Sequence, residues 1–446
     1  MKPNKSLFVI GSLFFVFGFI TWLNATLVPF LKIACELNNF ESYFVTFAFY
    51  IAYFIFAIPS SFVLKKVGFK QGMALGLWIM SVGALVFIPA AYTRSYGIFL
   101  TGLFMLGAGL ALLQTAANPY AAIIGPIETA ARRISIMGIC SKVAGTVAPL
   151  ILGSVVLSQM QVTKDLLPSM DEEQMSVMLD GLARLCVPPY IAIAVTLFLL
   201  AIVIRRTHLP EVDFSKEEAA QDKEQLNKEL NAQGTKLSTK RYIIQYPHLI
   251  FGVIAMFFYV GAEVISIDSL IGYATAQGIS ATDAKSFPMY SMLALIVGYL
   301  VGIVSIPRIM NQRMVLVFSA ILGLVFTLSA VVTSAYTSLT FLVFLGFANA
   351  MIWPTIWGLA LEGLGRHTSF GSSLLIMAIA GGAILPLVYG AFADYLPTLF
   401  NNMEDGVNLR LAYLVLLPCY LVILFYAMSV KAKENKENSS NDNPTK

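Results

Sequence analysis

The sequence has few charged residues. Only 12% of its 446 residues are Asp, Glu, Lys or Arg, whereas 58% are hydrophobic. Soluble domains average about 25% charged residues, so this composition excludes an ordinary soluble protein. The four cysteines and three histidines are scattered and match no metal-ligand or redox spacing. The sequence also lacks a phosphate-binding loop of the Walker type and a nucleophile–base motif. We therefore expect neither an enzyme nor an ATP-driven pump, and no metal, organic cofactor or nucleic-acid partner.

Long apolar runs make up most of the chain. Runs of about 20 apolar residues are typical of helices that cross a bilayer, and backbone amides in lipid must bond within their own helix. The fold class is therefore predicted to be an all-α membrane protein with twelve transmembrane helices. The predicted spans are 7–31, 43–64, 71–92, 97–124, 135–158, 187–205, 248–275, 287–306, 314–333, 338–362, 371–395 and 409–430.

Basic residues are distributed unevenly between alternate loops. Loops on the side of the N-terminus carry Lys65, Lys66, Lys70, Arg132, Arg133, Arg205, Arg206, Arg308, Arg313 and Arg366. The opposite loops carry Lys32, Arg94, Lys164, Arg184, Lys285 and Arg410. Cytoplasmic loops are enriched in Lys and Arg, so both termini are predicted to be cytoplasmic. No small-residue cleavage site follows the basic N-terminus, which indicates a retained first helix.

Two polar segments divide the chain into parts. Residues 207–246 are rich in Lys, Glu, Gln and Asn, which is typical of a cytoplasmic linker. The predicted domains are a six-helix bundle at 1–206 and a second six-helix bundle at 247–430. The polar tail at 431–446 is predicted to be disordered.

The two halves share sequence motifs. The segment "GTVAPLILG" at 145–153 matches "GAILPLVYG" at 382–390, with Gly, Pro, Leu and Gly at the same offsets. Gln114 and Pro119 align more weakly with Asn349 and Pro354. Internal duplication of six-helix halves is typical of transporters, whose binding site lies near the midplane between the halves.

The stretch "LALLQTAANPYAAIIGP" places two amides inside an apolar span. Gln114 lies about 17 residues into its span, or ~25 Å at 1.5 Å per residue. Asn118 is four residues further on and shares its helix face. Unpaired amides are costly in lipid, so both are expected to face the protein interior. They either line a cavity or bond neighbouring helices to one another.

Further amides and aromatic rings lie at similar depth in other spans. Amides donate and accept hydrogen bonds, as sugar hydroxyls require, and flat rings suit the CH faces of a pyranose. We expect Asn24, Gln114, Asn118 and Asn349 to bond hydroxyls, and Tyr259 and Trp353 to stack on the ring. For the tryptophans, packing within the protein is the alternative, and Trp22 also suits an interfacial anchor.

Three charged residues fall inside predicted spans. Lys142 lies in the fifth span, and Glu263 and Asp268 lie in the seventh. Charges inside a membrane are costly and often functional. We hypothesise that Lys142 and Glu263 face one cavity, pair in one state and separate in another. A static structural ion pair is the alternative. Asp268 is predicted either to take part in ion coupling or to line a wet vestibule on the outer side.

Several motifs resemble those of a known family. They are "TWLNATLVPFL", "AFYIAYFIFAIPSSFVLKKVGFKQG", "LQTAANPY", "YVGAE" and "GRHTSFGSSLLIMAIAGGAILP". With them the chain resembles the fucose:proton symporter and glucose/galactose transporter branch of the major facilitator superfamily, over nearly all twelve spans. The resemblance implies two pseudo-symmetric six-helix bundles and a monomer. It also implies import of a monosaccharide across the bacterial inner membrane, usually coupled to H⁺ or Na⁺.

The sequence departs from that branch at three positions. The resemblance implies a carboxylate where this chain has Ala25, a Glu in the fucose branch where it has Gln114, and a neutral polar residue where it has Lys142. Glu263 is then the carboxylate best placed to sense a cation. Lys142 is an alternative proton carrier, because a buried lysine can titrate near neutral pH.

The sequence thus predicts a cation-coupled importer of a hexose or deoxyhexose that works by alternating access. The predicted substrate-binding residues are Asn24, Gln114, Asn118, Lys142, Tyr259, Glu263, Asn349 and Trp353, and the predicted ion-coupling residues are Glu263, Lys142 and Asp268. Three alternatives remain open at this point: an uncoupled facilitator, a transporter of an anionic sugar or other organic solute, and a membrane sensor without transport.

Overall fold

The computed structural model describes residues 3–123, 130–166, 170–207, 246–306, 310–362, 364, 368–400 and 406–430. Within these ranges the regular structure is helical and contains no strand. The predicted linker at 207–246 lies almost entirely outside the described residues, and the predicted tail at 431–446 lies entirely outside them.

Helices α1 to α9 form the first half of the molecule, which we call the N-bundle. They are α1 (Pro3–Trp22), α2 (Asn24–Ala34), α3 (Asn39–Ser42), α4 (Phe44–Val67), α5 (Phe69–Thr93), α6 (Tyr96–Ile123), α7 (Ala130–Leu166), α8 (Glu172–Arg184) and α9 (Val187–Arg206).

Helices α11 to α21 form the second half, the C-bundle. They are α11 (Pro247–Asp268), α12 (Leu270–Ala276), α13 (Ala281–Ala284), α14 (Ser286–Ser305), α15 (Gln312–Val332), α16 (Ala335–Asn349), α17 (Ile352–Leu361), α18 (Thr368–Met377), η5 (Ala378–Ala380), α19 (Gly381–Leu399), α20 (Val407–Ala412), η6 (Tyr413–Val415) and α21 (Leu416–Ser429).

Twelve segments of these helices are long and apolar enough to cross a membrane, as the sequence predicts. The structure departs from the predicted bounds most clearly in two places. Helix α7 is longer than its predicted span, and α8 was not predicted. Asp171 begins α8 by accepting the backbone N–H of Gln174, which is the usual role of Asp at a helix N-terminus. Helix α8 carries Glu172, Glu173, Asp180 and Arg184, so it does not stand out as an apolar run in the sequence.

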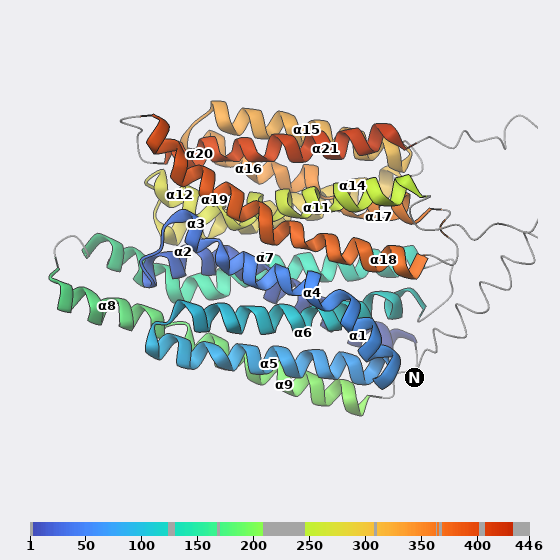
Figure 1. Cartoon of the computed structure of the whole chain (residues 1–446), viewed down its shortest axis with the longest axis horizontal. Coiled ribbons are helices and arrows are strands. Elements are labelled where there is room, and N and C mark those ends of the chain that lie inside the picture. Colours follow the sequence, from blue (N-terminus) through green and yellow to red (C-terminus); the bar gives the residue numbers. More distant parts are fainter. Residues whose placement is uncertain are drawn as a thin grey trace, which may run out of the picture.

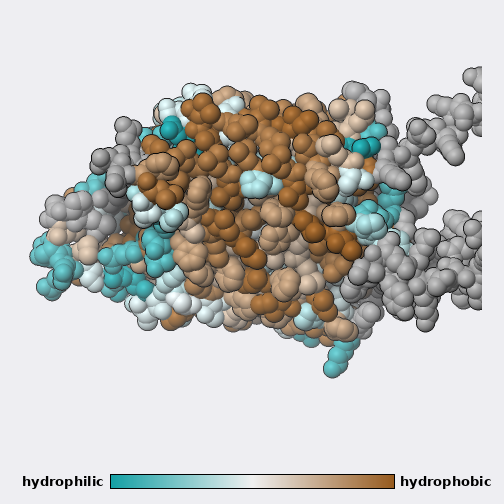
Figure 2. Space-filling view, turned by 45° about the horizontal axis from the view of Figure 1, so that its top comes forward, coloured by the Kyte–Doolittle hydropathy of each residue, from teal (hydrophilic) through white to brown (hydrophobic). Residues whose placement is uncertain are grey.

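The two bundles lie side by side, with the N-bundle in the lower part of Figure 1 and the C-bundle in the upper part. Helix α4 packs against α19, and α7 packs against α14, along the interface between the bundles. A hydrophobic band covers the middle of the molecule, and hydrophilic residues gather toward both ends (Figure 2). Because backbone groups are bonded within the helices, this band can face lipid.

Helix α1 begins and α21 ends at the same end of the molecule (Figure 1). We call this the terminal end and the opposite end, which carries α3, α8 and α20, the distal end. An even number of spans requires this arrangement.

The internal duplication extends to the packing of helices. The segment Phe14–Gly18 in α1 matches Phe257–Gly261 in α11, with two Phe and one Gly at the same offsets. A Cβ added at Gly18 would lie 1.8 Å from the Ser141 carbonyl oxygen on α7. A Cβ added at Gly381 would likewise lie 1.8 Å from the Phe257 carbonyl oxygen on α11. Each bundle therefore brings its first and fifth spans into backbone contact at a glycine.

Candidate transport site between the two bundles

The centre of the interface holds an ion pair that joins the bundles. The Nζ atom of Lys142 on α7 donates to Oε1 of Glu263 on α11 at 2.9 Å. The two side chains are 13% and 9% exposed. Two charges from different bundles thus neutralise each other in a mostly apolar region, which lowers the cost of burying both. The geometry agrees with the hypothesis that these residues face one another, while their roles in binding and coupling remain predictions.

An aromatic ring supports Lys142 from the other side. The ammonium lies over the Trp22 ring, 4.8 Å from its centroid, at a distance suited to a cation–π contact. Gly145, one helical turn after Lys142, makes room for the indole, since a Cβ there would lie 2.4 Å from Cδ1 of Trp22. Trp22 is 3% exposed and packs with Ala25, Ile267 and Met292. It is therefore a buried interface residue rather than an anchor at the membrane surface.

Glu263 lies beside a group of aromatic rings in the C-bundle. Tyr259 precedes it by one turn on α11 and interacts with its carboxyl group. The ring centroids of Tyr259 and Trp353 lie 6.3 Å apart. Trp353 stacks on Trp357 with a centroid distance of 5.7 Å and an angle of 17° between the ring planes. Tyr259 is buried, whereas Trp353 and Trp357 are partly exposed. Trp353 therefore offers partly exposed ring surface beside Tyr259, the aromatic neighbour of Glu263.

Gln114 is the amide of the N-bundle that the structure places in a defined contact. Its Nε2 donates to the Tyr53 hydroxyl at 3.1 Å, and its side chain is partly exposed. Tyr53 was not among the predicted site residues, because a tyrosine within an apolar segment is usually interpreted as a core residue that packs against its neighbours.

Asn349 lies inside the C-bundle, at the end of α16 where the tenth span is interrupted before α17. Its Oδ1 accepts from the Tyr420 hydroxyl at 2.9 Å, and its Nδ2 donates to Ser266 at 3.4 Å. The side chain is fully buried. These two hydrogen bonds satisfy the Asn349 amide within the C-bundle, so its geometry is explained by a role in joining neighbouring helices. A contact between Asn349 and a sugar remains a prediction.

Asn24 and Asp268 are also buried polar residues, but they differ from Asn349 in their hydrogen bonding. Each is 1% exposed. In the part of the chain that the structure describes, neither the Asn24 amide nor either oxygen of Asp268 has a hydrogen-bond partner. Most buried polar groups in proteins are bonded, so these two require an explanation. Asn118 cannot be compared with them, because its side chain lies outside the described residues.

The distal end is closed by contacts between the bundles. The carboxylate of Asp394 on α19 accepts the backbone N–H of Phe40 at 2.7 Å and that of Asn39 at 3.3 Å, and it also accepts the Asn39 side-chain amide. Gly390 lies against the same segment, since a Cβ there would be 2.7 Å from the Tyr43 ring. This side of the interface is therefore sealed by direct packing and hydrogen bonds between α3 and α19.

A second contact closes the other side of the distal end. The backbone N–H of Ala281, at the start of α13, donates to Oε1 of Gln161 on α7 at 3.2 Å. No sequence signal marked either contact, because each pairs polar residues that lie in loops or at helix ends far apart in the chain.

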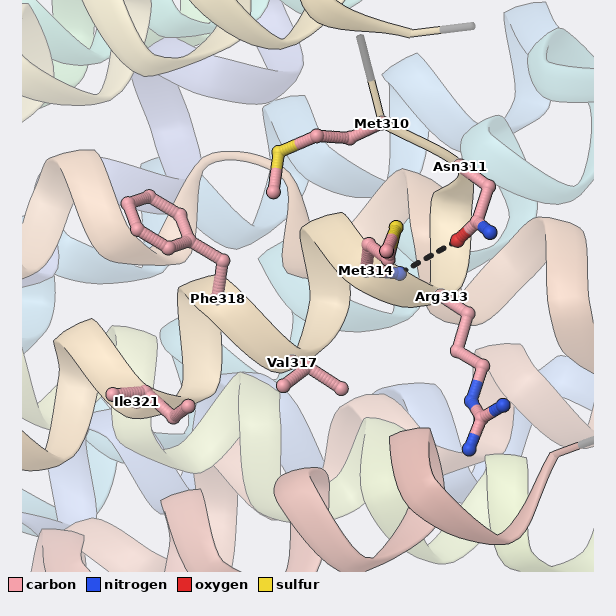
Figure 3. Close-up of a pocket in the computed structure, with 7 residues that line it drawn as sticks. All are labelled: Met310, Asn311, Arg313, Met314, Val317, Phe318 and Ile321. Atoms are coloured by element: carbon pink, nitrogen blue, oxygen red, sulfur yellow. Dashed lines mark hydrogen bonds between the residues drawn. The ribbon is translucent and has the colours of Figure 1, made fainter. Parts of the chain in front are cut away.

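A pocket in the described structure lies elsewhere. It surrounds the start of α15, where Figure 3 shows Met310, Arg313, Phe318 and Ile321 around the helix end. Phe318 and Ile321 are well exposed on the outer surface of the C-bundle. The pocket faces away from the bundle interface and includes none of the predicted site residues.

Two helix bundles, an internal duplication and a buried ion pair between the bundles together define a polytopic membrane transporter. The sequence profile of the Major Facilitator Superfamily matches residues 10–386. The chain belongs to this superfamily.

Relatives of known name cover nearly the whole chain. It is 35% identical over 419 residues to a glucose/galactose transporter of Brucella abortus, covering 93% of this chain and 92% of the relative. It is 32% identical to a putative glucose/galactose transporter of Helicobacter pylori, covering 98% of this chain and all of the relative. The crystal structure of the E. coli fucose:proton symporter has a TM-score of 0.67 at 27% identity, covering 97% of this chain and 100% of that one. The family assignment also supports the expectation that the chain is not an enzyme.

Proposed function

We propose that this protein imports a neutral monosaccharide, a hexose or deoxyhexose, across the bacterial inner membrane by alternating access. The observation that carries the proposal is the Lys142–Glu263 pair, which joins the two bundles beside the partly exposed ring of Trp353. The names of the relatives, which refer to glucose, galactose and fucose, support this substrate class.

In this proposal the ion pair responds to the sugar. Hydroxyls near Glu263 and Gln114 accept and donate hydrogen bonds, and the rings of Tyr259 and Trp353 pack on the CH face of the pyranose. Each such hydrogen bond contributes only about 1 kcal/mol net. Moderate affinity suits a transporter, because tight binding would slow release. Asn24, Asn118 and Asn349 are proposed as further hydroxyl partners.

The cargo is proposed to be neutral because Lys142 already has a counter-charge. A uronate would have to compete with Glu263 for the ammonium, whereas a neutral sugar would not. Transport of an anionic sugar is thus the second candidate, supported by the presence of a lysine at this position.

Uptake into proteoliposomes tests the proposal. We expect labelled glucose, galactose or fucose to enter, and at least one of them to accumulate when an inward H⁺ or Na⁺ gradient is imposed. Uptake without accumulation under either gradient would identify an uncoupled facilitator. Uptake confined to a uronate such as glucuronate, or no uptake of any monosaccharide, would contradict the proposal.

We also propose the orientation of the protein in the membrane and its oligomeric state from the arrangement of the helices. The terminal end is taken as cytoplasmic because the basic loops lie on that side of the spans, and a single chain supplies both bundles, so a monomer is sufficient. No organic cofactor is required in this proposal. Accessibility of single cysteines at the distal end, for example at Glu173 in α8, to an impermeant thiol reagent in whole cells tests the orientation. Light scattering of the purified protein tests the monomer.

A further inference from the structure

Asp268 occupies an unusual position at the end of a transmembrane helix. It is the last residue of α11, and Ser269 separates α11 from α12. The chain stays close to helical there, since the Ser269 N–H still donates to the Ile265 carbonyl oxygen. The Ser269 hydroxyl contacts the Ile265 carbonyl oxygen and the Tyr413 hydroxyl. The neighbouring hydroxyl is thus engaged elsewhere, and Asp268 keeps both oxygens without a partner among the described residues.

The first span of the N-bundle is interrupted within about one helical turn of the equivalent position. Leu23 separates α1 from α2, and Asn24, the first residue of α2, also has an unpartnered amide in the described structure. The duplicated motif that pairs Gly18 with Gly261 also pairs Ala25 with Asp268. Helix α2 packs against α11. Two unpartnered polar groups therefore come from equivalent interrupted spans that contact each other across the interface.

The packing confirms that this region lies between the bundles. Ile267, immediately before Asp268, belongs to the same buried cluster as Trp22 and Ala25, which flank Asn24 on α1 and α2. Asp268 therefore lies next to the interface and is not directed toward lipid. It is almost completely buried, and no cation among the described residues pairs with it.

Glu263 differs from Asp268 in this respect. The Glu263 carboxylate has the Lys142 ammonium 2.9 Å away, so a counter-charge accompanies its burial. A carboxylate without a counter-charge or hydrogen-bond donor is accommodated inside a protein by taking up a proton. Of the two carboxyl groups on α11, Asp268 is therefore the one whose surroundings favour the protonated form.

We propose that Asp268 carries the coupling proton, and that the Lys142–Glu263 pair responds to the sugar without itself carrying one. This inference rests on the proposed function. With the distal end open, the Asp268 carboxylate takes up one proton from the outside, and the neutral acid is then buried when the distal end closes. After the terminal end opens and the sugar leaves, the proton is released to the cytoplasm, so that one proton enters with each sugar.

The neighbours of Asp268 are consistent with a proton rather than Na⁺. The titratable side chains near Asp268 in the described structure include Glu263 on α11, Tyr50 on α4 and Tyr43 at the start of α4. Tyr43 also lies at the distal seal, where its ring faces Gly390 on α19. A sodium ion would need several oxygen ligands, and no hydroxyl among the described residues bonds to either oxygen of Asp268. A proton needs only one carboxylate oxygen.

The experiment compares Asp268→Asn with wild type in proteoliposomes that contain a pH dye. In wild type, adding the transported sugar outside should acidify the interior, and an inward gradient of one pH unit should sustain about tenfold accumulation. In Asp268→Asn the sugar-evoked acidification should disappear and accumulation should fall to onefold. Counterflow, which exchanges labelled for unlabelled sugar without net proton movement, should persist. Glu173→Gln, which removes an exposed carboxyl group from α8, is the matched control and should behave like wild type.

The outcomes separate this inference from the proposed function. Sugar-evoked acidification that survives in Asp268→Asn would overturn the inference. So would wild-type sugar transport without proton movement, although the sugar assignment would then stand. Failure of the wild type to transport any monosaccharide would instead refute the proposed function.

A second variant covers the case in which Asp268→Asn does not fold. Asp268→Glu keeps the carboxyl group and should retain coupling. Infrared difference spectra on sugar addition should show a protonated-carboxyl band at a different frequency in Asp268→Glu than in wild type. An identical band in both proteins, or no such band in wild type, would contradict the inference.

Discussion

Buried charged groups are compensated in different ways in the middle of the interface and in the region toward the distal end. In the middle, Lys142 and Glu263 come from opposite bundles and neutralise each other. Toward the distal end, Asp268 is buried with no partner among the described residues. Both arrangements avoid an isolated charge in an apolar interior, one by a counter-ion and the other, as we propose, by a proton. A counter-ion ties the two bundles together, whereas a proton leaves them free to separate.

Locking the distal end should have the largest effect. In a background without the four native cysteines, which are unpaired, Asn39→Cys combined with Asp394→Cys should form a disulfide across the seal. Transport should fall to background on oxidation and recover on reduction, because alternating access requires this contact to open. Each single-cysteine variant is the control. Full transport by the oxidised double variant would show that the distal end need not open at α3 and α19.

Breaking the ion pair should have the next largest effect. Lys142→Met and Glu263→Gln each leave one buried group without its partner, and removing one member of a buried pair typically costs about 3–5 kcal/mol. The double variant Lys142→Met/Glu263→Gln leaves no unpaired charge and should be more stable than Lys142→Met. Thermal unfolding in detergent measures this order. Equal stability of all three variants would mean that the pair is not formed in the dominant state.

Gly145→Ala should have a smaller effect on the same region. The added methyl group must displace the Trp22 indole that lies under Lys142, and such overpacking typically costs about 1–3 kcal/mol. Gly138→Ala is the matched control on α7, because a Cβ there meets nothing within 4 Å. Reduced transport and stability in Gly145→Ala, but not in Gly138→Ala, are expected. Similar behaviour of the two variants would argue against the role assigned to Trp22.

Trp22→Phe should have the smallest effect. A phenyl ring keeps an aromatic face but binds a cation less well than an indole, a difference of under about 1 kcal/mol. We expect the KM for sugar to rise a few-fold, and Trp22→Leu, which has no aromatic face, to raise it further. If both variants change KM equally, Trp22 contributes bulk rather than its interaction with the ammonium.

The sequence allowed much of this architecture to be predicted. The apolar runs predicted the twelve spans, and the motif shared by residues 145–153 and 382–390 predicted two related halves. The positions of Lys142 and Glu263 in spans five and seven suggested that they meet. The bounds of α7 and the existence of α8 were missed, since the added segments are polar and extend beyond the apolar runs.

Other features of the site were not predictable in this way. Asn349 has the same residue type as Asn24, yet Asn349 is bonded inside the C-bundle, whereas Asn24 has no side-chain partner in the part of the chain that the structure describes. The Tyr53 partner of Gln114 and the seal formed by Asp394 depend on which helices become neighbours. Residue type and depth alone did not distinguish these cases.

The sequence by itself determined that this chain spans the membrane twelve times in two related halves, because each apolar segment must satisfy its own backbone hydrogen bonds in lipid. The tertiary structure alone decided which polar side chains meet: Lys142 with Glu263, Asn349 with Tyr420, and Asp268 with no partner in the described chain. The reason is that these helices are apolar on nearly all sides. Their hydropathy fixes the depth of a residue, but only the packing of the bundles fixes the direction in which its side chain points.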